Sequence, residues 1–121
     1  MVYRRIVIVL ALAGALLGAD SVVASARKKL AEKKYDEAIT QLEAAYKTKP
    51  TPDVKKTLAE AYMTKGDSFM TNDTVPPRVK YPTALRSYRE VLKYDKDNKK
   101  AQQNISTIEG IYKSMGRPIP Q

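Results

Sequence analysis

The sequence predicts an all-α fold, in which antiparallel helices stack in consecutive pairs behind an N-terminal hydrophobic helix. Three observations lead to this prediction. Apolar residues recur at spacings of three and four along most of the chain after residue 20, while strand-like alternation is almost absent. Prolines, glycines and short polar turns separate these amphipathic stretches. Two of the stretches also repeat one another position by position.

Residues 1–19 are predicted to be an export signal or an uncleaved membrane anchor. Arg4 and Arg5 provide a basic start, and an uncharged run follows from Ile6 to Ala19. This run suits a secretory signal, because it is shorter than the roughly 20 apolar residues that a bilayer crossing needs. The alternative is an anchor formed by residues 6–26, with the two arginines on the cytoplasmic side. Either way, the body of the protein is expected in the cell envelope or periplasm.

The first amphipathic helix of the body is expected to begin near Tyr35 and to end before Pro50, which cannot continue it. Its apolar side comprises Tyr35, Ala38, Ile39, Leu42, Ala45 and Tyr46. Thr51 and Pro52 then favour a new helix start, by capping and by a fixed φ in the first turn. The buried stripe of this second helix consists of Val54, Leu58, Ala61 and Tyr62. Gly66 and Asp67 are predicted to end it, although Phe69 would allow one more turn.

The third helix is expected to open at Pro82, with an apolar side of Ala84, Leu85, Tyr88, Val91 and Leu92. A polar turn follows, and Asn98 is suited to cap the last helix. That helix places Ala101, Ile105, Ile108, Tyr112 and Met115 on one face. Gly116 is predicted to end it, which leaves residues 117–121 as a C-terminal tail.

Two segments share an apolar pattern. Tyr35, Ala38, Leu42 and Ala45 in the first correspond to Tyr81, Ala84, Tyr88 and Val91 in the second. This pattern resembles the second helix of the tetratricopeptide repeat, a helix–turn–helix unit. Leu58, Ala59, Tyr62 and Gly66 resemble its first helix, and Ile105 with Ser106 resembles a further first helix that closes the array.

The resemblance implies a repeat domain over residues 20–116, interrupted by an insertion loop at residues 68–80. It also bears on the leader, because the best signal-peptidase pattern ends at Ala26 and a weaker one ends at Ala19. Cleavage after Ala26 would remove most of the first repeat's opening helix. Cleavage after Ala19, or retention of the leader, is therefore favoured.

Tetratricopeptide repeats hold peptides on the concave surface lined by their first helices. The resemblance thus implies that Arg27, Lys56, Glu60 and Met63 lie on a protein-binding surface, with solvated side chains as the alternative. The insertion offers a second binding segment, because Pro76 and Pro77 favour an extended backbone and Phe69 and Val75 add apolar contacts. The alternative there is a long hairpin connection without a partner.

Composition narrows the function. The chain has no Cys and no His, which excludes disulfides, Cys/His zinc sites and Ser/His/Asp catalysis. The closest carboxylate pairs lie in a polar turn and at an exposed helix start, so we expect no enzyme activity, no cofactor or metal, and no small-molecule substrate. Nucleic acid is not an expected partner, because the tyrosines lie mainly on the apolar stripes.

The formal net charge of +9 favours acidic neighbours, and a solvated surface is the simpler alternative. Five cations between Arg27 and Lys34 would attract anionic lipid headgroups, with a solvated helix face as the alternative. The expected function is therefore that of an exported or tethered adaptor or scaffold that binds another protein. The alternative is a small accessory subunit of an integral-membrane complex, anchored by its N-terminal helix.

Overall fold

The computed structural model describes residues 18–121, which form five α-helices and no strand. These are α2 (Gly18–Ala31), α3 (Tyr35–Thr48), α4 (Pro52–Thr71), α5 (Pro77–Tyr94) and α6 (Lys99–Ser114). The predicted all-α class is confirmed for these residues. Residues 1–17, which hold nearly all of the predicted leader, lie outside the described part of the chain. None of the five described helices combines the length and the apolar character that a membrane crossing requires.

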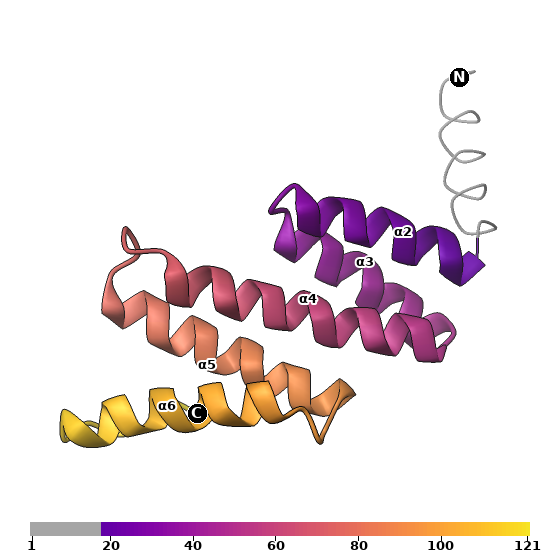
Figure 1. Cartoon of the computed structure of the whole chain (residues 1–121). Coiled ribbons are helices and arrows are strands. Elements are labelled where there is room, and N and C mark those ends of the chain that lie inside the picture. The colour runs from indigo at the N-terminus through magenta and orange to yellow at the C-terminus, as the bar shows by residue number, and fades with distance from the viewer. Residues whose placement is uncertain (1–17) are drawn as a thin grey trace, which may run out of the picture.

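Each helix packs antiparallel against the next, so the helices form layers in chain order (Figure 1). The α2/α3 hairpin lies on the α4/α5 hairpin, and α6 covers the far side of α5. Contact between α2 and α4 ties the two hairpins together in addition to the contact between α3 and α4. The first helices of the two hairpins are therefore neighbours.

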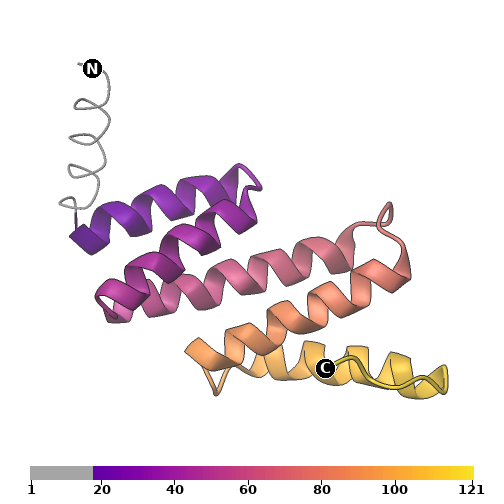
Figure 2. The same ribbon diagram turned by 180° about the vertical axis from the view of Figure 1, so that it is seen from behind.

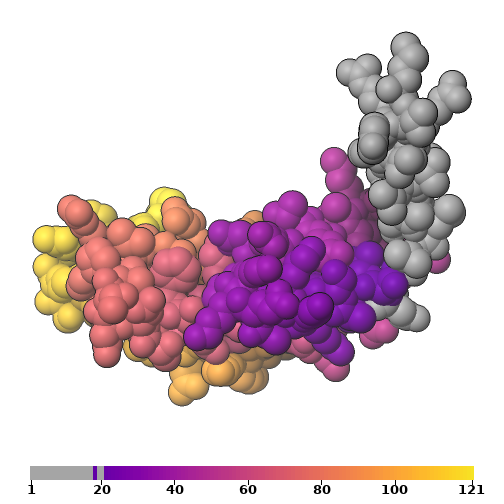
Figure 3. All heavy atoms as spheres, turned by 90° about the horizontal axis from the view of Figure 1, so that it is seen from above, coloured from indigo at the N-terminus to yellow at the C-terminus, as the bar shows by residue number. Residues whose placement is uncertain are grey.

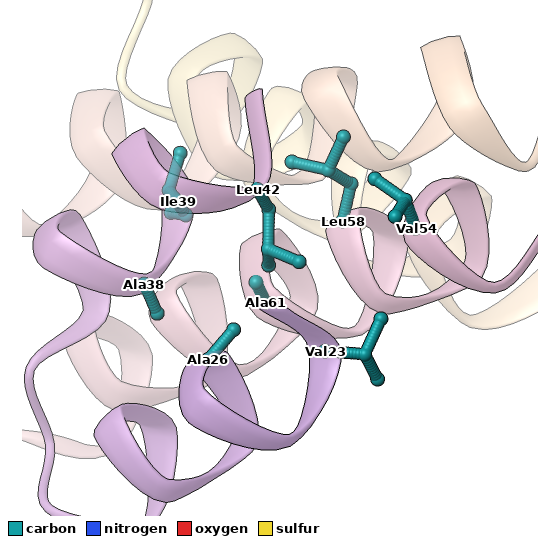
Figure 4. Packing of buried hydrophobic residues seen from close by; sticks show 8 residues of the cluster. All are labelled: Val23, Ala26, Ala38, Ile39, Leu42, Val54, Leu58 and Ala61. Atoms are coloured by element: carbon teal, nitrogen blue, oxygen red, sulfur yellow. The ribbon is translucent and has the colours of Figure 1, made fainter. Parts of the chain in front are cut away.

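The first core cluster joins α2, α3 and α4, whose side chains point toward one another (Figure 4). Its buried members are Val23, Ala26, Ala38, Ile39, Leu42, Val54, Leu58 and Ala61. The alanines let the helix backbones approach closely, and the larger side chains fill the space between them. Helix α2 contributes the buried Val23 and Ala26, and Val22 and Leu30 pack against the same cluster, so α2 belongs to this core from Val22 to Leu30.

Two further clusters hold the second half of the domain together. One joins α5 and α6 through Ala84, Leu85, Tyr88, Ile108 and Tyr112. The other brings Ala59 of α4, Val91 of α5 and Ala101 of α6 together. These clusters confirm most of the predicted apolar stripes. Met115 and Tyr35 are exceptions: Met115 follows the end of α6 and is 49% exposed, and the half-buried Tyr35 belongs to none of the three clusters.

The helix ends follow the local signals in the sequence. The hydroxyl oxygen of Thr51 accepts a hydrogen bond from the backbone N–H of Val54 at 3.3 Å, which caps α4. The side-chain oxygen of Asn98 accepts from the N–H of Ala101 at 2.9 Å and caps α6 in the same way. Gly116 adopts φ +64°, which ends α6 with a left-handed residue as predicted.

The insertion predicted as a loop over residues 68–80 is mostly helical. Helix α4 runs past Gly66 and Asp67 to Thr71, and α5 begins at Pro77, so only residues 72–76 connect them. The predicted loop is wrong because Phe69 and Met70 pack against the α5/α6 cluster, and this packing favours continued helix. The prediction that Pro82 opens the third helix is also wrong, because the helix already includes Tyr81, which packs against the same cluster. Pro77 takes the first position, and Pro82 lies inside α5.

Gly66 has a packing role instead of the predicted role as a helix end. It is buried in α4, and a Cβ atom added to it would lie 2.7 Å from Cε1 of Tyr88. No side chain fits at that distance without a shift of the Tyr88 ring. The glycine therefore lets α4 approach the large aromatic residue of α5.

The C-terminal tail, residues 117–121, turns back along α6 (Figure 2). Ile119 packs against the α5/α6 cluster, and the guanidinium of Arg89 donates a hydrogen bond to the carbonyl oxygen of Pro120 at 2.8 Å. These contacts hold the tail against the last two helices.

Candidate functional site

A groove of about 770 Å³ runs along one face of α4, which includes the buried Ala59 and the half-buried Met63 of the core packing. Spacings of three and four residues place its α4 residues on one side of the helix. These are Pro52, Lys55, Lys56, Ala59, Glu60, Met63, Thr64 and Asp67. The facing wall is formed by the end of α5 and the start of α6, through Tyr94, Asp95, Asn98 and Lys100.

Four of the eight predicted binding residues gather at this groove. Lys56, Glu60 and Met63 line it, as predicted from their place on the second helix of the body. Arg27 reaches across from α2, and its guanidinium lies 3.6 Å from the Glu60 carboxylate. Both side chains of this ion pair are about half exposed, so the pair is at the surface and contributes little to folding stability.

A set of three tyrosines supports one wall of the groove. The ring of Tyr94 stacks on that of Tyr62 at a centroid distance of 6.1 Å and meets Tyr46 edge-on at 5.4 Å. The hydroxyl of Tyr62 donates a hydrogen bond to Glu43. Burial, that hydrogen bond and the charge of Glu43 raise the pKa of Tyr62, so the hydroxyl stays neutral. The three rings come from α3, α4 and α5 and fix Tyr94 at the groove edge.

Asp67 lies in the groove, although the sequence predicted it in a turn. One of its carboxylate oxygens accepts a hydrogen bond from the Tyr88 hydroxyl at 2.7 Å, and the other lies 3.2 Å from the Lys100 ammonium. Burial and the hydrogen bond to Asp67 raise the pKa of Tyr88. The spacing of four residues from Met63 to Asp67 was a signal that could have placed Asp67 on the groove face.

The other four predicted binding residues lie elsewhere. Phe69 is half buried and lines a separate hollow of about 430 Å³ beside Tyr35 and Lys65. The second hairpin extends past the α2/α3 hairpin (Figure 3). The hollow is lined by residues 33–37, around the α2/α3 turn, and by Lys65, Ser68 and Phe69 of α4. Val75 is half buried in the connection, while Pro76 and Pro77 are exposed at the tip of the hairpin. The structure therefore separates the predicted loop site from the groove.

The basic cluster between Arg27 and Lys34 follows α2 away from the leader. Helix α2 has 14 residues and is about 20 Å long, so Lys33 and Lys34 lie at its far end from Gly18. Lys29 donates a hydrogen bond to Gln41 at 2.9 Å, and Lys34 lies 3.3 Å from Glu32. With Arg27 paired to Glu60, three of the five cations contact other side chains of the domain.

Two carboxylates that could act as acids or bases, Asp36 and Asp95, are bound by basic or amide side chains. Asp36 lies 2.7 Å from the Lys65 ammonium, and Asp95 accepts a hydrogen bond from the Asn98 amide at 3.0 Å. Within residues 18–121, no group of three or more acidic side chains is arranged to hold a metal ion. The groove thus offers charged groups and apolar contact over an open surface.

Comparisons with known proteins identified no relative of this chain. No protein-family model, no curated protein and no solved structure matches the chain.

Proposed function

We propose that this chain is an exported or membrane-tethered interaction module of the tetratricopeptide type, which binds a segment of another protein along the α4 groove. The groove itself carries the proposal. It combines a length of open helix face, the apolar side chain of Met63, the ring of Tyr94 and charges at both ends. An extended or helical segment of a partner would find both contact area and hydrogen-bonding groups there.

The packing supports the repeat interpretation. Ala38 and Ala84, which occupy matching positions of the two copies, are both fully buried, and so are Leu42 and Tyr88 to within 1%. The contact of α2 with α4 is the pairing of first helices that stacked hairpins make. An inner surface formed by first helices would run from α2 over α4 to α6. The groove is lined mainly by α4, and its other wall consists of Tyr94 at the end of α5, the turn after it and Lys100 of α6.

Affinity capture with the full chain from native membranes tests this function. A Met63→Glu substitution places a charge in the middle of the groove and should remove the bound partner. Lys47→Glu, on the exposed side of α3, is the matched control and should retain it. A Val75→Asp variant tests the hairpin tip separately. If the partner stays bound to the Met63→Glu variant and is lost from the Val75→Asp variant, the binding site is the tip instead of the groove.

The position of the leader cleavage belongs to the same proposal. Cleavage after Ala26 would remove Val23 and Ala26 from the first core cluster and leave only the last turn or so of α2. We therefore expect cleavage after Ala19 or retention of the leader. The intact mass of the protein purified from its cells distinguishes these outcomes, and a mature chain that begins at Arg27 would contradict them.

An accessory subunit of a membrane complex is the second candidate. One observation favours it: α2 begins at Gly18, inside the uncharged run that ends at Ala19, so the sequence leaves no linker between leader and domain. A retained leader would hold the domain at the membrane surface. Size-exclusion chromatography of a mild detergent extract separates the two candidates. Migration with a large assembly indicates the subunit, and migration as a free monomer indicates the adaptor.

A further inference from the structure

The two ends of the α4 groove carry charges of opposite sign, with Lys55 and Lys56 near the start of α4 and Asp67 toward its end. Lys55 and Lys56 line the end where α4 begins, and neither forms a salt bridge with any residue of the described part of the chain. Both side chains are exposed. Glu60, one turn further along α4, is paired with Arg27 of α2. This end therefore presents two free ammonium groups.

Asp67 is a fixed anion at the other end. Its carboxylate is held by the hydroxyl of Tyr88, which is only 1% exposed and comes from the packed α5/α6 cluster. The other partner of Asp67 is at the surface: the Lys100 side chain is 66% exposed and reaches over from the opposite wall. A surface ion pair of this sort contributes about 0–1 kcal/mol, so a cation from a partner can replace Lys100.

The pair of Asp67 and Lys100 stands between two hollows. Both residues line the main groove, and both also line an adjacent hollow of about 340 Å³. Met70 and Thr71 continue the α4 face into that second hollow, and Asn104 and Thr107 of α6 form its other side. Because Asp67 and Lys100 line both hollows, a partner segment that displaces Lys100 would reach from one hollow into the other along α4.

The spacing of these charges defines the partner. Lys56 and Asp67 are eleven positions apart on one helix, which is about 16 Å along its axis. An extended chain rises about 3.3 Å per residue and covers that distance in about five residues. Between the two charges the groove offers Ala59, Met63 and the ring of Tyr94. We infer that the groove selects an extended protein segment with an acidic side chain at Lys55 and Lys56, a basic side chain at Asp67 about five residues away, and apolar residues between them.

This inference rests on the proposed binding function and adds the chemistry of the partner. The probe is a displayed library of random twelve-residue peptides, selected on the full chain in mild detergent. Peptides that bind are expected to share an acidic and a basic residue about five positions apart. A peptide from this set is then measured against single variants by fluorescence anisotropy.

Three variants and a control make the measurement specific. Asp67→Asn keeps an oxygen for the Tyr88 hydroxyl but removes the charge, and should weaken binding about tenfold. Replacing the peptide's basic residue by Gln should weaken binding to the unsubstituted protein by the same factor. It should not weaken binding to the Asp67→Asn variant any further. Lys100→Met removes the competing cation and should strengthen binding about threefold. The double variant Lys55→Met/Lys56→Met should weaken it, while Lys113→Met, near the far end of α6, should change it less than twofold.

The outcomes separate this inference from the function on which it rests. If no peptide is enriched, the groove is not a peptide-binding site and the proposed function fails with the inference. If peptides are enriched without the spaced pair of charges, or bind the Asp67→Asn variant equally well, only the inferred partner chemistry is overturned. A simple structural role of the Asp67–Lys100 pair is contradicted if one variant weakens binding and the other strengthens it.

Discussion

Replacing Gly66 by alanine should destabilise the protein, although alanine is the better helix former. Gly66 is inside α4, and an added Cβ atom would lie 2.7 Å from Cε1 of Tyr88 and 3.0 Å from both Cδ1 and Cζ. The ring cannot move away easily, because it is 1% exposed and its hydroxyl is bound to Asp67. The substitution therefore forces α4 and α5 apart or pushes the ring out of its position.

Two opposing effects set the change in the free energy of unfolding caused by Gly66→Ala. Alanine in place of glycine in a helix interior gains about 1 kcal/mol. Overpacking a well-filled core costs about 1–3 kcal/mol, and three ring atoms within contact distance place this site at the upper end. We expect a net loss of about 1–2 kcal/mol in the free energy of unfolding. For a domain of this size, that corresponds to a melting temperature lower by roughly 5–10 °C.

Gly110 provides the matched control. It lies in α6, it is exposed, and no atom would lie within 4 Å of an added Cβ. Gly110→Ala should therefore stabilise the protein by about 1 kcal/mol through helix propensity alone. Urea unfolding followed by circular dichroism at the helical band measures both variants. The reasoning is refuted if Gly66→Ala unfolds at the same or a higher urea concentration than the unsubstituted protein.

Three other substitutions test local features of the fold. Lys33 has φ 62°, so Lys33→Gly should relieve left-handed strain and raise the free energy of unfolding by about 0.5–1 kcal/mol in the same urea titration; a decrease would contradict this. Asn98→Ala removes the cap of α6 and should cost about 1 kcal/mol, whereas an unchanged midpoint would show that the bond to Ala101 is dispensable. The pKa of Tyr88 is raised in the folded protein. The neutral Tyr88 hydroxyl therefore contributes fully to the free energy of unfolding below its ordinary pKa of 10.0. This contribution is lost as the pH rises above that value, because the unfolded chain loses the proton first. Stability measured from pH 9 to 11.5 should fall less steeply for Tyr88→Phe than for the unsubstituted protein, and equal slopes would rule out this role.

Local patterns in the sequence predicted the helices well and their lengths less well. The spacing of Ala38, Leu42, Leu58 and Tyr88 follows from helix geometry, and a cap such as Thr51 acts within four residues, so both can be recognised without knowing the fold. The extent of α4 depends instead on contacts with distant residues. Phe69 and Met70 continue the helix because α5 and α6 offer them a packing surface, and no local signal records that surface.

The same distinction applies to the groove. Lys56, Glu60 and Met63 share one face of a single helix, so their spacing was sufficient to group them. Lys100 and Tyr94 reach the groove from other helices, and sequence spacing gives no indication of that wall. The glycine at position 66 indicated a turn in the sequence. Its actual role is to leave space for the Tyr88 ring, and this need arises only when α4 and α5 pack together.

The three tyrosines beside the groove give the protein an internal optical signal. Tyr46, Tyr62 and Tyr94 join helices of both hairpins, and the chain contains no tryptophan to mask their near-ultraviolet bands. Stacked rings in a fixed asymmetric setting give circular dichroism in that region, while the far-ultraviolet bands depend on helix content. Separation of the hairpins would therefore be visible as a loss of the aromatic bands before the helices themselves melt.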